Sequence, residues 1–71
     1  MNKLQKLFEN GVRFQIVCTD EYLDWTIYSK NGQEKIETKF GLDFNFEIEQ
    51  LWQAAKKHYP DAACFKEESN G

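Results

Sequence analysis

The sequence predicts an α+β domain with the element order α-β-β-β-α, in which a three-stranded antiparallel meander packs on one long C-terminal helix. Three successive runs alternate apolar and polar residues, as half-buried strands do, and residues 44–59 carry an apolar stripe with helical spacing. Between the second and third runs, Asn31–Gly32 is the strongest short signal of a hairpin. With 71 residues the chain is expected to form one domain, residues 1–71, with frayed ends at 1–2 and 68–71.

Residues 3–9, "KLQKLFE", predict a short amphipathic helix, because Leu4, Leu7 and Phe8 recur at the i, i+3 and i+4 positions of one face. The Asn-Gly pair at Asn10–Gly11 predicts the end of this helix. Gly11 is expected in the left-handed conformation that commonly closes a helix.

The three alternating runs are residues 12–18, 22–29 and 34–40. The side chains expected to face inward are Val12, Phe14, Ile16 and Cys18 in the first run, Leu23, Trp25 and Ile27 in the second, and Ile36, Thr38 and Phe40 in the third. Lys35, Glu37 and Lys39 are expected to face outward. This pattern predicts one apolar sheet face for the long helix and one solvated face.

The same alternation predicts the strand register. In the first hairpin, Phe14 would lie opposite Ile27, Ile16 opposite Trp25, and Arg13 opposite Tyr28. A two-residue loop at Asn31–Gly32 would place Tyr28 opposite Lys35, Ile27 opposite Ile36, Trp25 opposite Thr38, and Asp24 opposite Lys39. A slip of one residue would move Ile36 to the solvated face, which favours this register.

The long helix is expected over residues 44–58. Its stripe consists of Phe44, Ile48, Leu51, Trp52, Ala55 and Tyr59. Asp43 or Asn45 can cap its start, and Pro60 ends it. Residues 62–67, "AACFKE", could then form a short final strand. Phe46 lies on the polar side of the helix, and the pattern gives it no role.

Composition narrows the classes of function. The net charge is −3, from 9 basic and 12 acidic residues, which argues against a dedicated nucleic-acid binder. The N-terminus has no apolar signal segment, and no apolar run reaches the ~20 residues that span a bilayer. We therefore expect a cytoplasmic protein with no membrane partner, in which Cys18 and Cys64 are structural thiols. His58 is the only histidine, and no catalytic or metal-ligating group can be assembled, so we expect no enzyme, cofactor or metal.

Two surfaces are candidates for contact with a protein partner or in a homodimer. The first is the edge of the first strand, Phe14, Gln15, Ile16 and Val17, which carries no charge to discourage a visiting strand. The second is an acidic end of the molecule, where Asp20, Glu21, Asp43 and Glu47 should gather. The predicted function is a small protein-interaction module, a regulator or inhibitor encoded by a phage or a bacterium.

The alternative function is nucleic-acid binding. Its candidate patch consists of Arg13, Tyr28, Lys35, Lys56 and Lys57, with an aromatic ring between cations that can stack on a base and hold a phosphate. The order α-β-β-β-α resembles that of the double-stranded RNA-binding domain, and also that of some small acidic phage inhibitors of host defence. Where the RNA-binding family opens its second helix with a lysine-rich motif, this chain has "LDFNFEIE". No functional residue is carried over from either resemblance.

Overall fold

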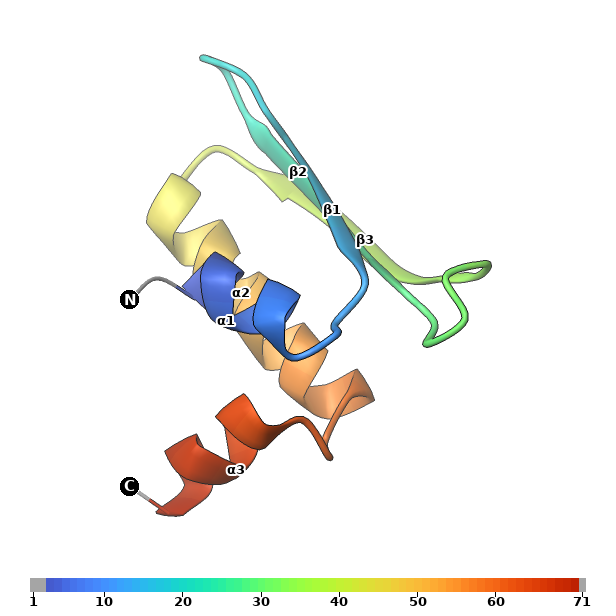
Figure 1. Ribbon diagram of the computed structural model, residues 1–71. Coiled ribbons are helices and arrows are strands. Elements are labelled where there is room, and N and C mark those ends of the chain that lie inside the picture. The colour runs from blue at the N-terminus through green and yellow to red at the C-terminus, as the bar shows by residue number, and fades with distance from the viewer. Residues whose placement is uncertain (1–2, 71) are drawn as a thin grey trace.

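The computed structural model describes residues 3–70 and confirms the α+β fold class. The elements are α1 (Lys3–Glu9), β1 (Phe14–Cys18), β2 (Leu23–Tyr28), β3 (Lys35–Gly41), α2 (Phe44–His58) and α3 (Ala63–Asn70). The sheet is antiparallel with the order β1-β2-β3, and α1 and α2 lie on one of its faces, so the other face is uncovered (Figure 1). Residues 1–2 and 71, at the ends expected to fray, lie outside the described residues.

α1 ends as predicted. Gly11 adopts the left-handed conformation, with φ of 76°. The backbone N–H of Val12 then donates to the Leu7 carbonyl at 3.1 Å, which satisfies one of the last carbonyls of the helix. Leu7 and Val12 are both buried, so this turn also brings β1 beneath the helices.

The register of the first hairpin is confirmed. Phe14 lies opposite Ile27 and Ile16 lies opposite Trp25. Beyond the strand ends, the Tyr28 N–H donates to the Arg13 carbonyl at 2.8 Å. The alternation in both strands is uninterrupted, and their inward side chains join one core.

The second hairpin differs from the prediction at its loop. Tyr28 lies opposite Lys35 as expected, but the turn is closed by the Gly32 N–H, which donates to the Ser29 carbonyl at 2.8 Å. A two-residue type I′ loop would need positive φ at both Asn31 and Gly32. Only the glycine has it, with φ of 78°. The Asn-Gly pair therefore marks the hairpin correctly but forms a different turn.

Beyond this loop the predicted register of β3 is wrong by one residue. A bulge at Ile36 places Glu37 opposite Ile27, Thr38 opposite Thr26 and Lys39 opposite Trp25. The faces of β3 are therefore reversed: Ile36 and Phe40, expected inward, are 41% and 71% exposed. Thr38 lies on the open face with its hydroxyl 2.9 Å from that of Thr26.

A buried carboxylate accounts for the reversed faces. Glu47, in the first turn of α2, is 7% exposed and accepts a hydrogen bond from the Trp25 indole N–H at 3.2 Å. Gly41 lies opposite buried Leu23, at an inward position. A Cβ at Gly41 would collide with the Glu47 carboxyl group and would lie only 2.8 Å from its Cγ. The bulge therefore places Gly41, which has no side chain, at the inward position next to the Glu47 carboxyl group.

The two ends of α2 are held in different ways. Asp43 caps the start, since its Oδ1 accepts a hydrogen bond from the Phe46 N–H at 3.0 Å. At the other end, the buried Tyr59 hydroxyl donates to the Tyr28 carbonyl and accepts a weak bond from the Arg13 N–H at 3.4 Å. The hydroxyl therefore joins the end of α2 to the first hairpin.

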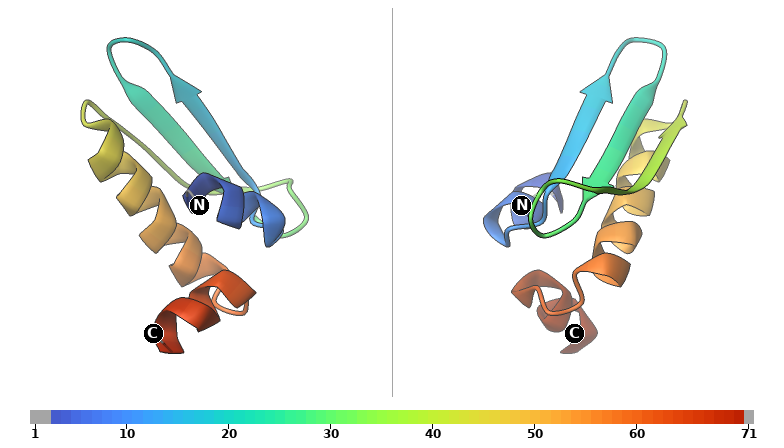
Figure 2. Two further views of the ribbon diagram at one scale, coloured as in Figure 1. Left: turned by 60° about the vertical axis from the view of Figure 1, so that its left-hand side comes forward. Right: turned by 90° about the vertical axis from the view of Figure 1, so that its right-hand side faces the viewer.

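The segment that could have formed a final strand is the helix α3 instead. Phe65 of α3 is 2% exposed and packs edge-on against Trp52, with ring centroids 4.9 Å apart. The Asn10 side chain accepts a hydrogen bond from the Cys64 N–H at 3.3 Å and donates to the Lys6 carbonyl at 2.8 Å. α3 is thus fixed to the helix layer, where it covers Trp52 rather than extending the sheet (Figure 2).

One core joins the sheet to all the helices. Its buried apolar residues are Leu7, Val12, Leu23, Trp25, Ile27, Leu51, Trp52, Ala54, Ala55, Tyr59, Cys64 and Phe65. Both tryptophans lie in it, as predicted. Phe44 was expected to start the buried stripe of α2, but this first residue of the helix is 51% exposed. Within residues 3–70, no helix has both the length and the apolar character that crossing a membrane requires.

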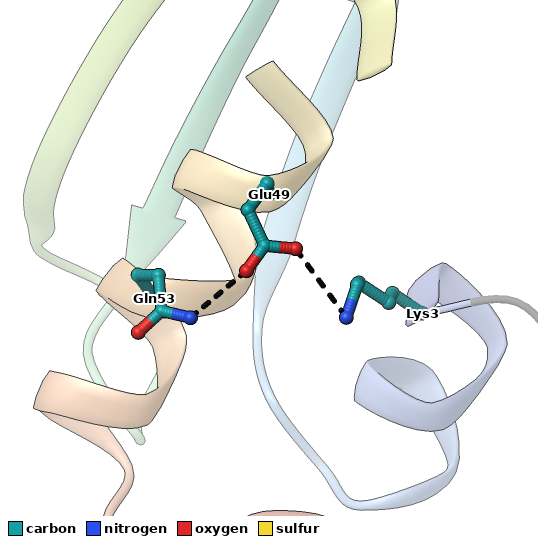
Figure 3. Close-up of polar contacts among 3 residues, drawn as sticks. All are labelled: Lys3, Glu49 and Gln53. Atoms are coloured by element: carbon teal, nitrogen blue, oxygen red, sulfur yellow. Dashed lines mark hydrogen bonds and ion pairs between the residues drawn. The ribbon is translucent and has the colours of Figure 1, made fainter. Parts of the chain in front are cut away.

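α1 and α2 are also joined at their surface (Figure 3). The Glu49 carboxylate accepts a hydrogen bond from Gln53 Nε2 at 2.9 Å and lies 3.4 Å from Lys3 Nζ. The hydrogen bond from Gln53 is the main cause that lowers the pKa of Glu49 below its ordinary value. Burial opposes this effect, and the nearby Lys3 ammonium adds to the lowering. The Lys3 ammonium also lies 4.7 Å from the centre of the Trp52 ring.

Replacing Gly41 with alanine should destabilise the fold through the Glu47 carboxyl group. We expect a loss of about 1–3 kcal/mol in the free energy of unfolding, as for other overpacked buried sites. Chemical denaturation of G41A, E47A and the double variant measures the coupling between the two sites. In the E47A background, where the obstructing carboxyl group is gone, G41A should cost much less. Equal costs in both backgrounds would contradict this packing.

The Glu49 ion pair should contribute a pH-dependent stability. Because the folded-state pKa is lowered, the contribution is complete above the ordinary glutamate pKa of about 4.3 and is lost as pH falls through the lower folded value. E49Q should therefore be less stable than the wild type by about 0.5 kcal/mol at neutral pH. Thermal melts between neutral and acidic pH should show the difference shrinking on acidification. E9Q, on the exposed end of α1, is the control, and a pH-independent difference for E49Q would refute the ion-pair contribution.

Candidate protein-interaction surfaces

The structure places three of the four predicted acidic-end residues around the start of α2. Asp20 and Glu21 lie in the β1–β2 turn, which extends past the start of α2 at the top of Figure 1. Asp43 caps the same helix. Glu47 does not belong to this surface, because its carboxylate is buried against Trp25. The prediction was wrong for Glu47 because an acidic residue early in a helix is ordinarily solvated.

The same end of the molecule exposes four large apolar side chains, which we call the aromatic corner: Tyr22, Phe40, Leu42 and Phe44. They are 38%, 71%, 83% and 51% exposed, respectively. The Tyr22 and Phe40 rings meet edge to face, with centroids 6.2 Å apart. Tyr22, Leu42 and Phe44 line a shallow hollow of about 200 Å³ together with Asp20 and Glu21. The corner and the acidic turn therefore form one surface.

Sequence reasoning missed the aromatic corner because its residues also fit core patterns. Phe40 continues the alternation of β3, and only the bulge at Ile36 turns it outward. Phe44 has the helical spacing of the α2 stripe but precedes the part of the helix that contacts the sheet. The available signal was Gly41, since a glycine inside a strand commonly marks a bulge or a close approach of another group.

The predicted strand edge is present. β1 is the outer strand of the sheet next to β2, and α3 does not pair with it (Figure 2). Phe14 and Ile16 are half-buried against the core, whereas Gln15 and Val17 are exposed on the open face. The residues Phe14–Cys18 carry no charge.

The predicted nucleic-acid patch is only partly assembled. Arg13 and Tyr28 line one hollow of about 370 Å³, and Lys35 lies opposite Tyr28 in the sheet. Arg13 Nε donates to the Lys30 carbonyl at 2.9 Å, and the Tyr28 hydroxyl donates to Gln15 at 2.8 Å. Lys56 and Lys57 belong to α2, in the layer on the other face of the sheet, so the five residues do not form one surface.

The two cysteines and the histidine differ in their surroundings. Cys18 and Cys64 do not form a disulfide with each other. Cys64 is buried, but Cys18, expected to face inward, is exposed at the end of β1. His58 Nε2 lies 3.3 Å from the Glu37 carboxylate. Within residues 3–70, no three His, Cys, Asp or Glu side chains gather as a metal site would need.

Comparison with known proteins gave no relative: the chain matches no family model, no curated protein and no solved structure. The exposed side chains themselves distinguish the candidate surfaces. The aromatic corner has the largest apolar exposure, the strand edge offers backbone groups, and the patch around Tyr28 offers an aromatic ring between two cations.

Proposed function

We propose that this protein is a small cytoplasmic protein-interaction module, a regulator or inhibitor that acts by contact through the aromatic corner. The observation that carries the proposal is the joint exposure of Tyr22, Phe40, Leu42 and Phe44 at one end of the molecule. Tyr22, Phe40 and Phe44 are aromatic, the residue class that is enriched in the buried centres of protein interfaces, where a few side chains supply most of the affinity.

Exposing these side chains has an energetic cost that a partner would relieve. Burying apolar surface is worth about 25 cal/mol per Å², so a set of large exposed residues forgoes several kcal/mol. Isolated exposed apolar residues are ordinary on any protein surface, but adjacent ones commonly mark a binding site. Leu42 and Phe40, at 83% and 71% exposed, are the side chains with most to gain.

The charges around the aromatic corner define the kind of partner. Asp20 and Glu21 line the hollow, no basic residue does, and Asp43 lies between Leu42 and Phe44 in the chain. An apolar centre with an acidic rim complements a protein segment that carries apolar side chains flanked by lysine or arginine. The rim charges would mainly speed association and exclude acidic competitors.

The state of the two cysteines supports the proposed compartment. Cys18 is an exposed thiol and Cys64 a buried one, and they are not joined in a disulfide. Exposed free thiols persist in a reducing compartment, which is the usual condition of the cytoplasm.

The test is quantitative affinity capture from the native host with wild-type and variant baits. F40S/L42S removes two anchors and should reduce recovery of the specific partner at least about tenfold. F8S is the matched control, because Phe8 is 74% exposed and lies by Arg13 and Gly32, at the opposite end of the sheet. Both variants should melt like the wild type, since neither alters the core.

D20K/E21K tests the acidic rim separately. The purified partner should associate more slowly with this variant, and the wild-type rate should fall as salt increases. The proposal fails if F40S/L42S and F8S recover the same proteins in the same amounts.

Nucleic-acid binding is the second candidate, and one observation favours it. The bulge turns Glu37 to the helix side of the sheet and places Thr38 beside Thr26 on the open face. Glu37, which was expected on the open face, therefore does not repel a phosphate backbone there, although the same shift also takes Lys39 away from that face. Asp24 and the net charge of −3 still oppose binding.

We expect single-stranded RNA and DNA to bind weakly, with dissociation constants above micromolar at ~150 mM salt, and less tightly still as salt increases. Fluorescence titration of the wild type and Y28A measures this. Sub-micromolar binding that Y28A abolishes would promote this candidate above the interaction module. F40S/L42S serves as the control, because it leaves Tyr28 and its neighbours unchanged.

A further inference from the structure

The open edge of β1 has a defined hydrogen-bonding phase. The Tyr28 N–H donates to the Arg13 carbonyl and the Thr19 N–H donates to the Tyr22 carbonyl, so Arg13 and Thr19 direct their backbone groups toward β2. In an antiparallel pair, every second residue directs its N–H and C=O groups toward the partner strand. Gln15 and Val17 therefore also direct theirs toward β2. The outward N–H and C=O groups of β1 are therefore those of Phe14, Ile16 and Cys18.

The two edges of the sheet differ in how they resist a visiting strand. β3 carries Lys35, Glu37 and Lys39 and is bulged at Ile36, and both features discourage edge pairing. β1 has no charged residue, no proline and no bulge along residues 14–18. Nothing within residues 3–70 pairs with its open side.

We propose that a second copy of this chain pairs with this edge, antiparallel, about a two-fold axis at Ile16. This centre places Ile16 opposite Ile16 and Phe14 opposite Cys18 of the second copy, so all outward backbone groups meet partners. A centre at Gln15 or Val17 would also bring outward groups together, but it would pair Cys18 with Val12 or Phe14 with Asp20, and neither Val12 nor Asp20 belongs to β1. Only the centre at Ile16 pairs all five residues of Phe14–Cys18 with one another. A centre between two neighbouring residues would place a residue whose backbone groups point away from β2 opposite a residue whose backbone groups point toward it.

The side chains are compatible with this register. On the helix side, half-buried Phe14 and Ile16 would continue the apolar face across the axis. On the open face, exposed Gln15 would lie opposite Val17 of the second copy. Arg13 would lie opposite Thr19, next to Asp20 of the second copy, which gives opposite charges at both ends of the pairing.

This dimer does not use the four apolar side chains of the aromatic corner, although Asp20 belongs both to the acidic rim of the corner and to the charged end of the pairing. It uses the backbone of Phe14–Cys18, whereas the aromatic corner uses side chains from Tyr22 and from the end of β3 onward. The chain's own tail does not compete for the edge, because α3 is held in the helix layer by Asn10 and Trp52.

Analytical ultracentrifugation over a wide protein concentration range measures the proposed dimer. Q15K/V17K places like charges opposite each other on both sides of the axis and should weaken dimerisation at least about tenfold. Q15E/V17K places opposite charges there and should restore it, and it keeps the favourable pairing of the lysine introduced at position 17 with Asp24 of the same chain. Both variants change only exposed positions of the open face, and unaltered thermal melts would show that the fold is retained.

A disulfide test reads the register directly. In a C18S background, Q15C/V17C places cysteines opposite each other at a non-hydrogen-bonded pair, where Cα atoms are about 4.5 Å apart and can form a disulfide. The covalent dimer should form under mild oxidation in this variant and not in Q15C or V17C alone.

A wild type that stays monomeric at all concentrations overturns the proposal. So does equal dimerisation of Q15K/V17K and Q15E/V17K. If F40S/L42S abolished dimerisation instead, self-association would belong to the aromatic corner, and β1 would not be the interface.

Discussion

The hydrogen bond between the buried Glu47 carboxylate and the Trp25 indole is the constraint on which the sheet depends. A buried carboxylate is tolerated only with a hydrogen-bonding partner, and Trp25 supplies one from the centre of β2. The carboxyl group also needs space at the sheet, which only a residue without a side chain leaves. Gly41 provides that space when it faces inward opposite Leu23, and β3 must therefore shift by one residue.

This shift exchanges side chains between core and surface. Glu37 passes to the helix side, where it meets His58, and Phe40 passes to the open side, where it meets Tyr22. The buried Glu47 carboxylate thus determines which apolar side chains of β3 lie on the surface. Phe40 is exposed in the aromatic corner because of the way in which α2 is attached to the sheet. A change at Glu47 or Gly41 in the interior is therefore expected to alter which side chains the aromatic corner exposes.

The sequence predicted those elements whose pattern of apolar and polar residues fits a single secondary structure. The first hairpin alternates without interruption, α2 has a stripe of several turns, and Gly11 follows a short helix. The register of β3 could not be derived in this way, because its alternation favours inward positions for Ile36 and Phe40, whereas the structure exposes both. The deciding contact comes from Glu47, which periodicity treats as an ordinary surface charge. α3 was missed because the tail is too short for its pattern to separate strand from helix.

The side chain of Asn10 bridges α1 and α3, since it bonds both the Lys6 carbonyl and the Cys64 N–H. Together with Phe65 against Trp52, it makes the completed core depend on a segment that is synthesised after α2. A nascent chain that lacks this segment leaves one edge of Trp52 uncovered and Asn10 without the Cys64 N–H. The domain is therefore expected to gain its full stability only when residues 63–70 have been synthesised and have docked, which leaves an earlier nascent form open to chaperones or proteases.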